Sequence, residues 1–312
     1  MPKRKIKFKH RVEYILFAVI VMLIKISPLF LIKSNQKMVR FLLKKLSKRR
    51  SGIVAKNLKI AFPHYTAGEI SALTRAISRH FSSVFIEIIT IFVKKQPEKI
   101  LKKVEILHPE VLERALDKKK GVILFSAHFG NWELVPLILS RQLNQKVNSV
   151  AREMNNPLVE KKVQQFRKYM GSELIYKRNS MRTILKRLEK NGIVYLLIDH
   201  NTIAREGVFV NFFGKPASTV TSVSQLHLKK AIPIVPVFIH YEKEKIVLEL
   251  LEEIDAASTS TGNQKEDILQ LTQRCTSIIE EKIRQYPEQW FWFHNRWKTR
   301  PPRQGKMPHD EK

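Results

Sequence analysis

A histidine and a glutamate five positions apart are the residues of this chain whose types and spacing could do chemistry. His128 and Glu133 belong to the sequence HFGNWE, which follows an apolar run at residues 121–125. Residues five apart do not share a face of a helix, so we expect His128 to end a strand and Glu133 to lie in the first turn of the next helix. Asn131 is then expected to cap that helix, with the N–H groups of the turn, Gly130 included, pointing outward.

This arrangement predicts acid–base chemistry. A carboxylate that accepts a hydrogen bond from one imidazole nitrogen fixes the tautomer and leaves the other nitrogen free to take a proton. We therefore expect Glu133 to hold His128, and no serine or cysteine is needed as a nucleophile. The alternative is structural, with a histidine that ends a strand and a glutamate that interacts favourably with the helix dipole.

The elements that must position this pair alternate between strands and helices. This pattern predicts an α/β fold with a mostly parallel central sheet flanked by helices, because strands joined through helices lie parallel with right-handed crossovers. A further helical pattern at residues 53–95 predicts a long helix. The expected strands cover residues 122–125, 147–151, 173–176, 193–199, 232–240 and 246–253, and the expected helices cover residues 131–143, 156–170, 180–190 and 265–286.

Two more polar residues, Arg152 and Asp199, follow predicted strands, and we expect them at the same sheet edge as His128. Arg152 suits a lipid phosphate or a developing oxyanion, because a guanidinium is permanently charged and can donate two hydrogen bonds at once. Asp199 could orient Arg152 or a neighbouring group. The alternative is a structural Arg–Asp pair that bridges strand ends. We interpret His200 as a turn residue.

The net charge of +29 is concentrated at the amino end, where residues 1–59 carry 17 Lys and Arg against the single acidic residue Glu13. These charges flank an interrupted apolar segment at residues 14–32. Its length is marginal for a membrane span, and basic clusters lie on both sides. We therefore expect an anchor that spans or lies in the interface and is attracted to an anionic membrane surface. The alternative is a basic core helix.

We expect three parts: a membrane anchor at residues 1–50, a helical segment at 51–103 and an α/β core at 104–312. The single cysteine, Cys275, permits no internal disulfide, indicates a reducing compartment and is expected to pack in a core. Glycine-rich nucleotide-binding motifs and clustered metal-ligand motifs do not occur in the sequence. We expect no nucleotide cofactor and no structural metal.

Four ordered blocks carry a family resemblance. HFGNWE resembles the H-x4-D/E motif of glycerolipid and lipid A acyltransferases, and YPEQWFWFHNRWKTRP at residues 286–301 resembles the closing segment of the bacterial late lipid A acyltransferases, the lauroyl and myristoyl transferases. AREMNNPL at 151–158 and LIDHN at 197–201, followed by VFVNFFG, are similar to the family's middle blocks. The chain departs from the pattern at residues 201–206 and at Asn295, which bears on acceptor and chain-length specificity.

The resemblance implies transfer of a fatty acyl group from acyl carrier protein to a hydroxyl on an acyl chain of a Kdo-bearing lipid A precursor. It further implies an enzyme of the bacterial inner membrane whose catalytic domain faces the cytoplasm. The residues to which we assign roles are His128 and Glu133 for catalysis, Arg152, Asp199, Gly130 and Asn131 for substrate binding or transition-state stabilisation, and Trp290, Trp292 and Arg296 for support of the site, with an acyl or phosphate contact. The aromatic residues from 290 onward alternate as in a strand with one buried face.

Other functions remain open at this point. The acceptor could be another glycolipid or a phospholipid, since the broader family also acylates mannosylated phosphoinositides, and the donor could be acyl-CoA. Two alternative hypotheses are not enzymes: a basic nucleic-acid-binding protein and a non-catalytic membrane scaffold. We expect no nucleic-acid partner, because the positive charge flanks an apolar segment and does not line a recognition face. The presence of His128, Glu133, Arg152 and Asp199 argues against a scaffold.

Overall fold

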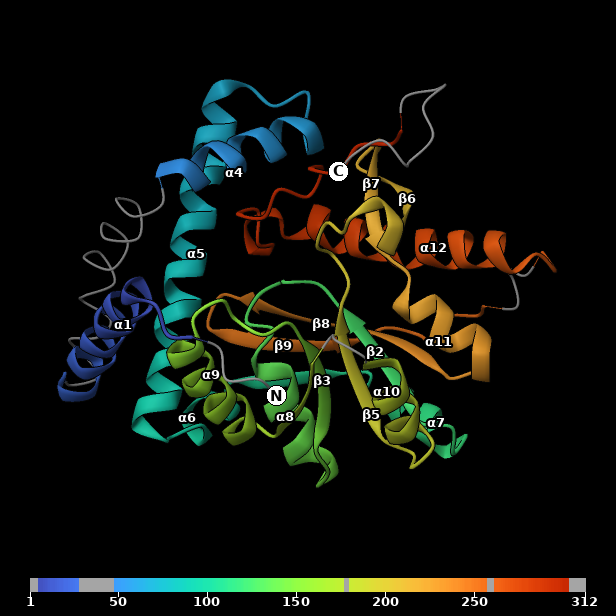
Figure 1. Cartoon of the computed structure of the whole chain (residues 1–312), viewed down its shortest axis with the longest axis horizontal. Coiled ribbons are helices and arrows are strands. Elements are labelled where there is room, and N and C mark those ends of the chain that lie inside the picture. Colours follow the sequence, from blue (N-terminus) through green and yellow to red (C-terminus); the bar gives the residue numbers. More distant parts are fainter. Residues whose placement is uncertain (1–4, 28–47, 177–179, 257–260, 303–312) are drawn as a thin grey trace.

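The computed structural model describes residues 5–27, 48–176, 180–256 and 261–302 (Figure 1). The helices are α1 Phe8–Ile26, α4 Lys48–Ala61, α5 Ala67–Lys94, α6 Glu98–Leu101, α7 Pro109–Asp117, α8 Leu134–Leu143, α9 Pro157–Tyr169, α10 Ser180–Leu188, α11 Ser222–Lys230 and α12 Gln264–Gln285, with short 3-10 turns η1 Ala204–Glu206 and η3 Pro287–Gln289. The strands are β1 Val104–Leu107, β2 Val122–Ser126, β3 Val147–Ala151, β4 Ser172–Tyr176, β5 Ile193–Leu197, β6 Gly207–Phe212, β7 Lys215–Val220, β8 Ile234–Glu242 and β9 Lys245–Leu250.

Seven strands form one sheet in the order β1-β9-β8-β2-β5-β3-β4, and β6 and β7 form a separate antiparallel hairpin. Neighbours in the large sheet are parallel except for β8 and β9. The predicted α/β fold with a mostly parallel sheet is confirmed. In the register of β2 on β5, Ser126 pairs with Leu197, so the residues that follow these two strands emerge beside each other.

Helices cover both faces of the sheet. In β2, Ile123 and Phe125 pack in one apolar cluster with residues of α5, α10, α11 and α12. Val122 and Leu124 point the other way and pack with residues of α7, α8 and α9. Neither face of β2 contacts solvent, which explains why β2 is a nearly continuous apolar run in the sequence.

The helical pattern predicted over residues 53–95 is two helices, α4 and α5, and not one. The chain leaves the helix at residues 62–66, which include Pro63. α5 then begins with a capping box, in which Glu69 N donates to Thr66 Oγ1 and Thr66 N donates to Glu69 Oε2. The break therefore has a local cause, because proline lacks an N–H and the capping box satisfies the free donors of the new helix.

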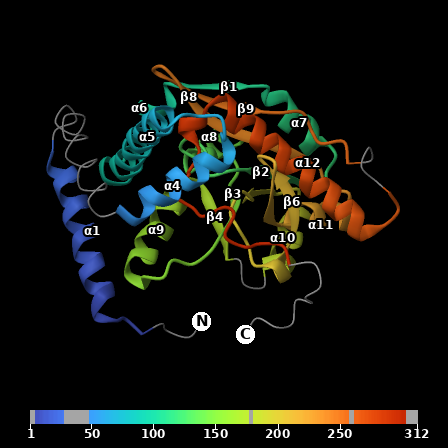
Figure 2. The same ribbon diagram turned by 90° about the horizontal axis from the view of Figure 1, so that it is seen from above.

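One helix of the described part of the chain, α5, is long and apolar enough to cross a membrane by length and composition alone. Core helices pass the same test, and α5 contributes Ile77, Phe81 and Val84 to a core cluster. α1 lies beside α5 at the edge of the molecule in both views (Figure 2). The predicted anchor segment is helical as far as Ile26, and its last residues, 28–32, lie outside the described residues.

The aromatic segment after α12 is not the strand that its alternation predicted. It begins with η3 and continues through turns, with a single bridge between Phe129 and Trp290. Its backbone bonds to the loop after β2: Gly130 N donates to Gln289 O at 2.8 Å, and Phe291 N donates to His128 O at 2.9 Å. Alternate aromatic side chains of this segment are buried, as predicted. The segment packs and hydrogen-bonds against the loop after β2 and does not extend a sheet.

Candidate active site

A histidine–aspartate pair lies where β2 and β5 end. His128 follows β2 by two residues and Asp199 follows β5 by two residues, and the strands are neighbours. His128 Nδ1 is 2.8 Å from Asp199 Oδ1. The Asp199 side chain is fully buried, whereas 20% of the His128 side chain is exposed. The pair therefore presents one edge of the imidazole outward from a buried carboxylate.

The second oxygen of Asp199 is also occupied. Asp199 Oδ2 accepts from His128 N at 3.0 Å and from Trp290 Nε1 at 2.8 Å. Burial alone would raise the pKa of Asp199, but the charge and the hydrogen bonds of His128 outweigh it and hold the pKa well below its ordinary value. An ionised carboxylate only accepts hydrogen bonds, so His128 Nδ1 is the donor and Nε2 is the basic nitrogen.

The prediction that Glu133 holds His128 is wrong. Glu133 accepts hydrogen bonds from Arg167 of α9, at 3.1 and 3.0 Å from Nε and 2.5 Å from Nη2. Burial would lower the pKa of Arg167, but the Glu133 carboxylate outweighs it and raises the pKa above its ordinary value. The acid that orients His128 is Asp199, and the five-residue spacing placed Glu133 near the histidine without making them partners.

Arg167 was missed by the sequence reasoning. It lies 34 positions after Glu133 in a helix with four other Lys and Glu residues, and no short motif sets it apart. Arg152, which the sequence did single out, follows β3 directly, and its side chain is exposed. Of the two kinds of partner predicted for Asp199, the structure shows the neighbouring group, His128, and not Arg152.

Gly130 and Asn131 have structural partners in the turn. Gly130 has φ +53°, and a Cβ there would lie 2.1 Å from Ile239 O, so only glycine fits. Its N–H donates to Gln289 O, which removes Gly130 from the predicted oxyanion donors. Asn131 does not cap α8, because the N-cap residue is Glu133 and no side-chain cap bond forms.

Asn131 instead points into a buried polar cluster. Its Nδ2 donates to Glu87 Oε2 of α5 at 2.6 Å, and the Tyr241 hydroxyl of β8 donates to the same oxygen. Burial raises the pKa of Glu87, an effect that the two hydrogen bonds partly offset. This cluster ties the turn after His128 to α5 and to the sheet.

Two further histidines stack against His128. The rings of His128 and His200 lie 3.7 Å apart and 3° from parallel, and His294 stacks on the other face of His200 at 4.0 Å and 14°. Burial lowers the pKa of His200 to about 3 and that of His294 to about 4, although the negative charge of Asp199 acts to raise both pKa values. Both rings are therefore neutral at pH 7, and the interpretation of His200 as a plain turn residue is incomplete.

One ligand atom each from His128, Asp199 and His200 lies within 4.8 Å of the others, a grouping that could suggest a metal site. The ring geometry does not fit. Zinc sits in the plane of each imidazole at about 2.0–2.1 Å from the nitrogen, whereas parallel stacked rings direct their lone pairs alongside each other. Nδ1 of His128 is also committed to Asp199. We assign no metal to this group.

The closing segment forms the back wall of the site. Trp290 and Trp292 are fully buried and Arg296 is 1% exposed, so these three side chains do not contact lipid. Trp292 Nε1 donates to Pro287 O, and Arg296 Nη1 donates to Ser218 O of β7, both at 2.7 Å. Burial lowers the pKa of Arg296 to about 10. All three side chains are therefore held by contacts inside the molecule, and Trp290 contacts the Asp199 carboxylate directly.

Two aromatic rings, besides the stacked histidines, lie close to His128. Trp132 meets the imidazole edge to face at 4.9 Å, and Phe291 lies 6.3 Å away. Phe81 of α5 packs against both of these rings, and Phe293 extends the cluster. The His128 ring therefore borders an apolar aromatic cluster.

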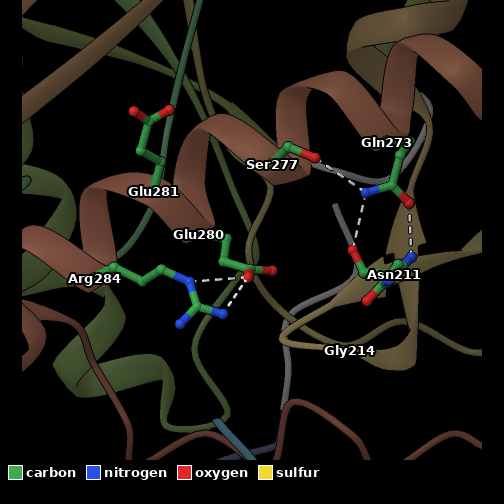
Figure 3. A pocket seen from close by; sticks show the side chains of 7 residues that line it. All are labelled: Asn211, Gly214, Gln273, Ser277, Glu280, Glu281 and Arg284. Atoms are coloured by element: carbon green, nitrogen blue, oxygen red, sulfur yellow. Dashed lines mark hydrogen bonds and ion pairs between the residues drawn. The ribbon is translucent and has the colours of Figure 1, made fainter. Parts of the chain in front are cut away.

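A hollow elsewhere in the molecule has different chemistry. It has a volume of about 290 Å³ and lies between the β6–β7 hairpin and α12 (Figure 3). Its walls are polar: Gln273 Nε2 donates to Asn211 O and Ser277 Oγ, and Arg284 pairs with Glu280. It contains none of the residues predicted to do chemistry.

Comparison with known proteins gives consistent matches. Residues 1–299 match the family described as bacterial lipid A biosynthesis acyltransferase. The chain is 26% identical over 267 residues to the lipid A biosynthesis lauroyltransferase of Escherichia coli K12, covering 81% of each chain. It is 28% identical over 263 residues to a lipid A biosynthesis acyltransferase of Haemophilus influenzae, covering 82% of this chain and 80% of that one. A phosphatidylinositol mannoside acyltransferase of Mycolicibacterium smegmatis is 23% identical over 197 residues, or 62% of each chain.

Proposed function

We propose, on the premise that this chain belongs to the bacterial lipid A biosynthesis acyltransferase family, that it transfers a fatty acyl group from acyl carrier protein to a hydroxyl of a lipid A precursor. The observation that carries the proposal is the His128–Asp199 pair, with an oriented imidazole whose Nε2 is engaged by no hydrogen bond of the described residues. Such a group is a general base for an alcohol.

In the proposed reaction, His128 Nε2 removes the proton from the acceptor hydroxyl as its oxygen attacks the thioester carbonyl carbon. A C–O bond forms, and the carbonyl oxygen becomes an oxyanion. When this intermediate collapses, the C–S bond breaks, and the departing thiolate takes the proton back from the His128 imidazolium. The products are an ester and a free thiol, and no acyl–enzyme intermediate is needed. Asp199 stabilises the imidazolium without taking its proton.

The oxyanion needs donors, and we assign them to the N–H groups of Asn131 and Trp132. Within the described residues neither N–H has a hydrogen-bond partner, in contrast to that of Gly130. They precede α8, so the positive end of the helix dipole adds to their effect. The bond from Asn131 to Glu87 fixes the turn that presents them.

The Glu133–Arg167 pair is proposed to fix the start of α8 relative to α9. Both side chains are partly exposed, 15% for Glu133 and 23% for Arg167, and we propose that the pair borders the substrate. Arg152 is exposed at the same sheet edge and is proposed to bind a phosphate of the acceptor. Glu133 thus keeps a place in the proposed site, but with a changed role.

We propose that α1 contacts the membrane. It belongs to residues 1–50, the first of the three parts into which we divide the chain. Nine of the twelve exposed large apolar side chains among the described residues lie between residues 6 and 26. The spacing of three and four residues places most of them on one side of α1, namely Phe8, Val12, Ile15, Val19, Met22 and Ile26. Lys5, Lys7, Lys9 and Arg11 flank this stripe and suit anionic lipid.

α1 is also fastened to the part of the chain that leads from Arg152 into α9. Asn156, the N-cap residue of α9, donates from Nδ2 to His10 O at 2.8 Å and to Glu13 Oε2 at 2.9 Å. A membrane-bound α1 would therefore hold the site next to the lipid surface. We propose the cytoplasmic side of the inner membrane as the location, because an acyl carrier protein is available there.

The proposed donor and acceptor have one alternative each. Acyl-CoA offers the same thioester as acyl carrier protein. A mannosylated phosphoinositide is the alternative acceptor, favoured by the similarity to the mycobacterial enzyme. The net charge of +29 suits the acidic donors and the anionic acceptors equally well.

The test uses the purified full chain in anionic vesicles. Acyl carrier protein and CoA thioesters of several chain lengths are supplied with a Kdo-bearing lipid A precursor or a mannosylated phosphoinositide, and mass spectrometry follows the acceptor. We expect the lipid A precursor to gain the mass of one acyl group, fastest with the carrier-protein donor. If only the phosphoinositide gains an acyl group, it is the acceptor in place of the lipid A precursor. If neither acceptor gains an acyl group from any of the donors, the proposed function is contradicted.

A further inference from the structure

The middle ring of the histidine stack has an unusual environment. His200 lies between the rings of His128 and His294, nearly parallel to both. Its Nε2 is buried without a hydrogen-bond partner in the described residues. A buried imidazole nitrogen without a partner is unfavourable, so hydrogen bonding does not account for a histidine at this position. The ring faces remain as the part of His200 that makes contacts.

The outer ring is held firmly. His294 Nε2 accepts from Asn201 N at 2.9 Å, and His294 O accepts from Asn57 Nδ2 at 2.7 Å. Since His294 is neutral and accepts at Nε2, its proton is on Nδ1. Because the His294 ring is fixed, it prevents the His200 ring from tilting away from His128. Asn201 thus positions His294, His294 positions His200, and His200 contacts His128.

Charge decides what this stack can do. The charged groups around His200 are Asp199, which it follows in the chain, and Arg296, while Lys298 acts on His294. Burial and the cationic neighbours lower the pKa of His200 to about 3 and that of His294 to about 4, so both rings are neutral at pH 7. A cation above the face of a neutral aromatic ring is attracted to it, whereas a second charged imidazole would repel it.

We propose that His200 is a positioning residue for the transfer reaction: its neutral ring, backed by His294, supports the imidazolium that forms when His128 takes the acceptor proton. Asp199 holds that imidazolium by its edge, and His200 supports its face. This inference rests on the proposed function, since it assumes that His128 changes protonation during the reaction.

The experiment compares variants that keep or remove the aromatic face. His200→Leu and His200→Gln remove it, whereas His200→Phe keeps a flat neutral ring. We expect kcat to fall about 10-fold in the first two and to about a third in His200→Phe, with the KM of the acceptor changed less than about twofold. The acid limb of the kcat–pH profile should move to lower pH by about half to one unit in His200→Leu and His200→Gln, because the imidazolium loses its support.

A matched control is His227→Phe on α11, where the ring bonds to Ile232 O away from the stack, and it should leave both kcat and the acid limb unchanged. Circular dichroism melting identifies the variants that fold. An unmoved acid limb in the folded non-aromatic variants would overturn the inference, and so would a His200→Phe variant as slow as His200→Leu. The wild-type chain and His128→Ala in the same series separate the two failures. Absence of transfer by the wild-type chain would contradict the proposed function, whereas a fully active His128→Ala would remove His128 from the mechanism.

Discussion

Two hydrogen-bonded pairs of side chains lie next to each other in this molecule, and they differ in how their partners meet. His128 and Asp199 are 71 positions apart and meet because β2 and β5 are neighbours in the sheet. Glu133 and Arg167 are 34 positions apart and meet through the packing of helices. The motif supplies one member of each pair. The motif therefore contains His128 and Glu133, but their partners come from sheet order and helix packing.

The pairs also differ in what they can do. Asp199 accepts from the imidazole, from the His128 backbone and from Trp290, and an imidazole can either donate or accept a proton. Both oxygens of Glu133 are taken by a guanidinium that keeps its charge. One pair is suited to moving a proton, and the other to fixing two helices.

The largest expected effect is on the first pair. We expect His128→Ala to lower acyl transfer about 10³- to 10⁴-fold, because the acceptor hydroxyl loses its general base. The measurement is the initial rate in anionic vesicles at pH 7.5. Vesicle binding and the melting temperature should stay near wild type, and a folded, membrane-bound variant that transfers at the wild-type rate would remove His128 from the mechanism.

Asp199→Asn should lower kcat about 10²- to 10³-fold. The amide is similar in size but has no charge, so it neither stabilises the imidazolium nor selects the tautomer in which Nε2 is basic. The KM of the acceptor should change little. Rates at several pH values would show the loss, and a variant within threefold of wild type across the range would indicate that His128 works without this carboxylate.

The second pair should give a smaller and non-additive effect. Glu133→Gln and Arg167→Met each remove one partner and leave the other charge partly buried, so we expect each to reduce kcat/KM about 10- to 100-fold. The double variant should be no slower than the worse single variant. Purely additive losses in this double-mutant cycle would show that Glu133 and Arg167 act separately.

The smallest effect is on stability against pH. The pKa values of His80, His200 and His294 are about 4, 3 and 4 in the folded chain, below an unfolded value of about 6.5. The unfolded chain therefore binds more protons below about pH 6.5, and stability should fall as the pH drops toward 4, by at most about 1.4 kcal/mol per unit for each histidine.

Urea midpoints at pH 7, 6 and 5 would measure this slope. His80→Phe on α5, which does not touch the histidine–aspartate pair, should reduce the slope. A midpoint that stays constant from pH 7 to 5 would contradict the neutral state of these rings.

The sequence predicts the sheet well and the contacts poorly. Strand 147–151 and the helix before Gly171 follow from apolar periodicity and end signals, because these depend on neighbours along the chain. Cys275 is buried, as predicted. The bond from Trp290 to Asp199 joins residues 91 positions apart, and no local pattern contains that information. The aromatic alternation from residue 290 predicted the buried positions correctly and the strand wrongly. A pattern of buried side chains does not determine which groups the backbone hydrogen-bonds to.

The pairing of His128 with Asp199 is tested most directly by nuclear magnetic resonance of the chain with ¹⁵N-labelled histidine. A hydrogen-bonded His128 Nδ1–H should give a downfield proton signal, identified by its absence in His128→Ala. We predict that this signal persists in Glu133→Gln and is lost in Asp199→Asn. The opposite result, with loss in Glu133→Gln and retention in Asp199→Asn, would show that Glu133 holds the imidazole and would contradict the account.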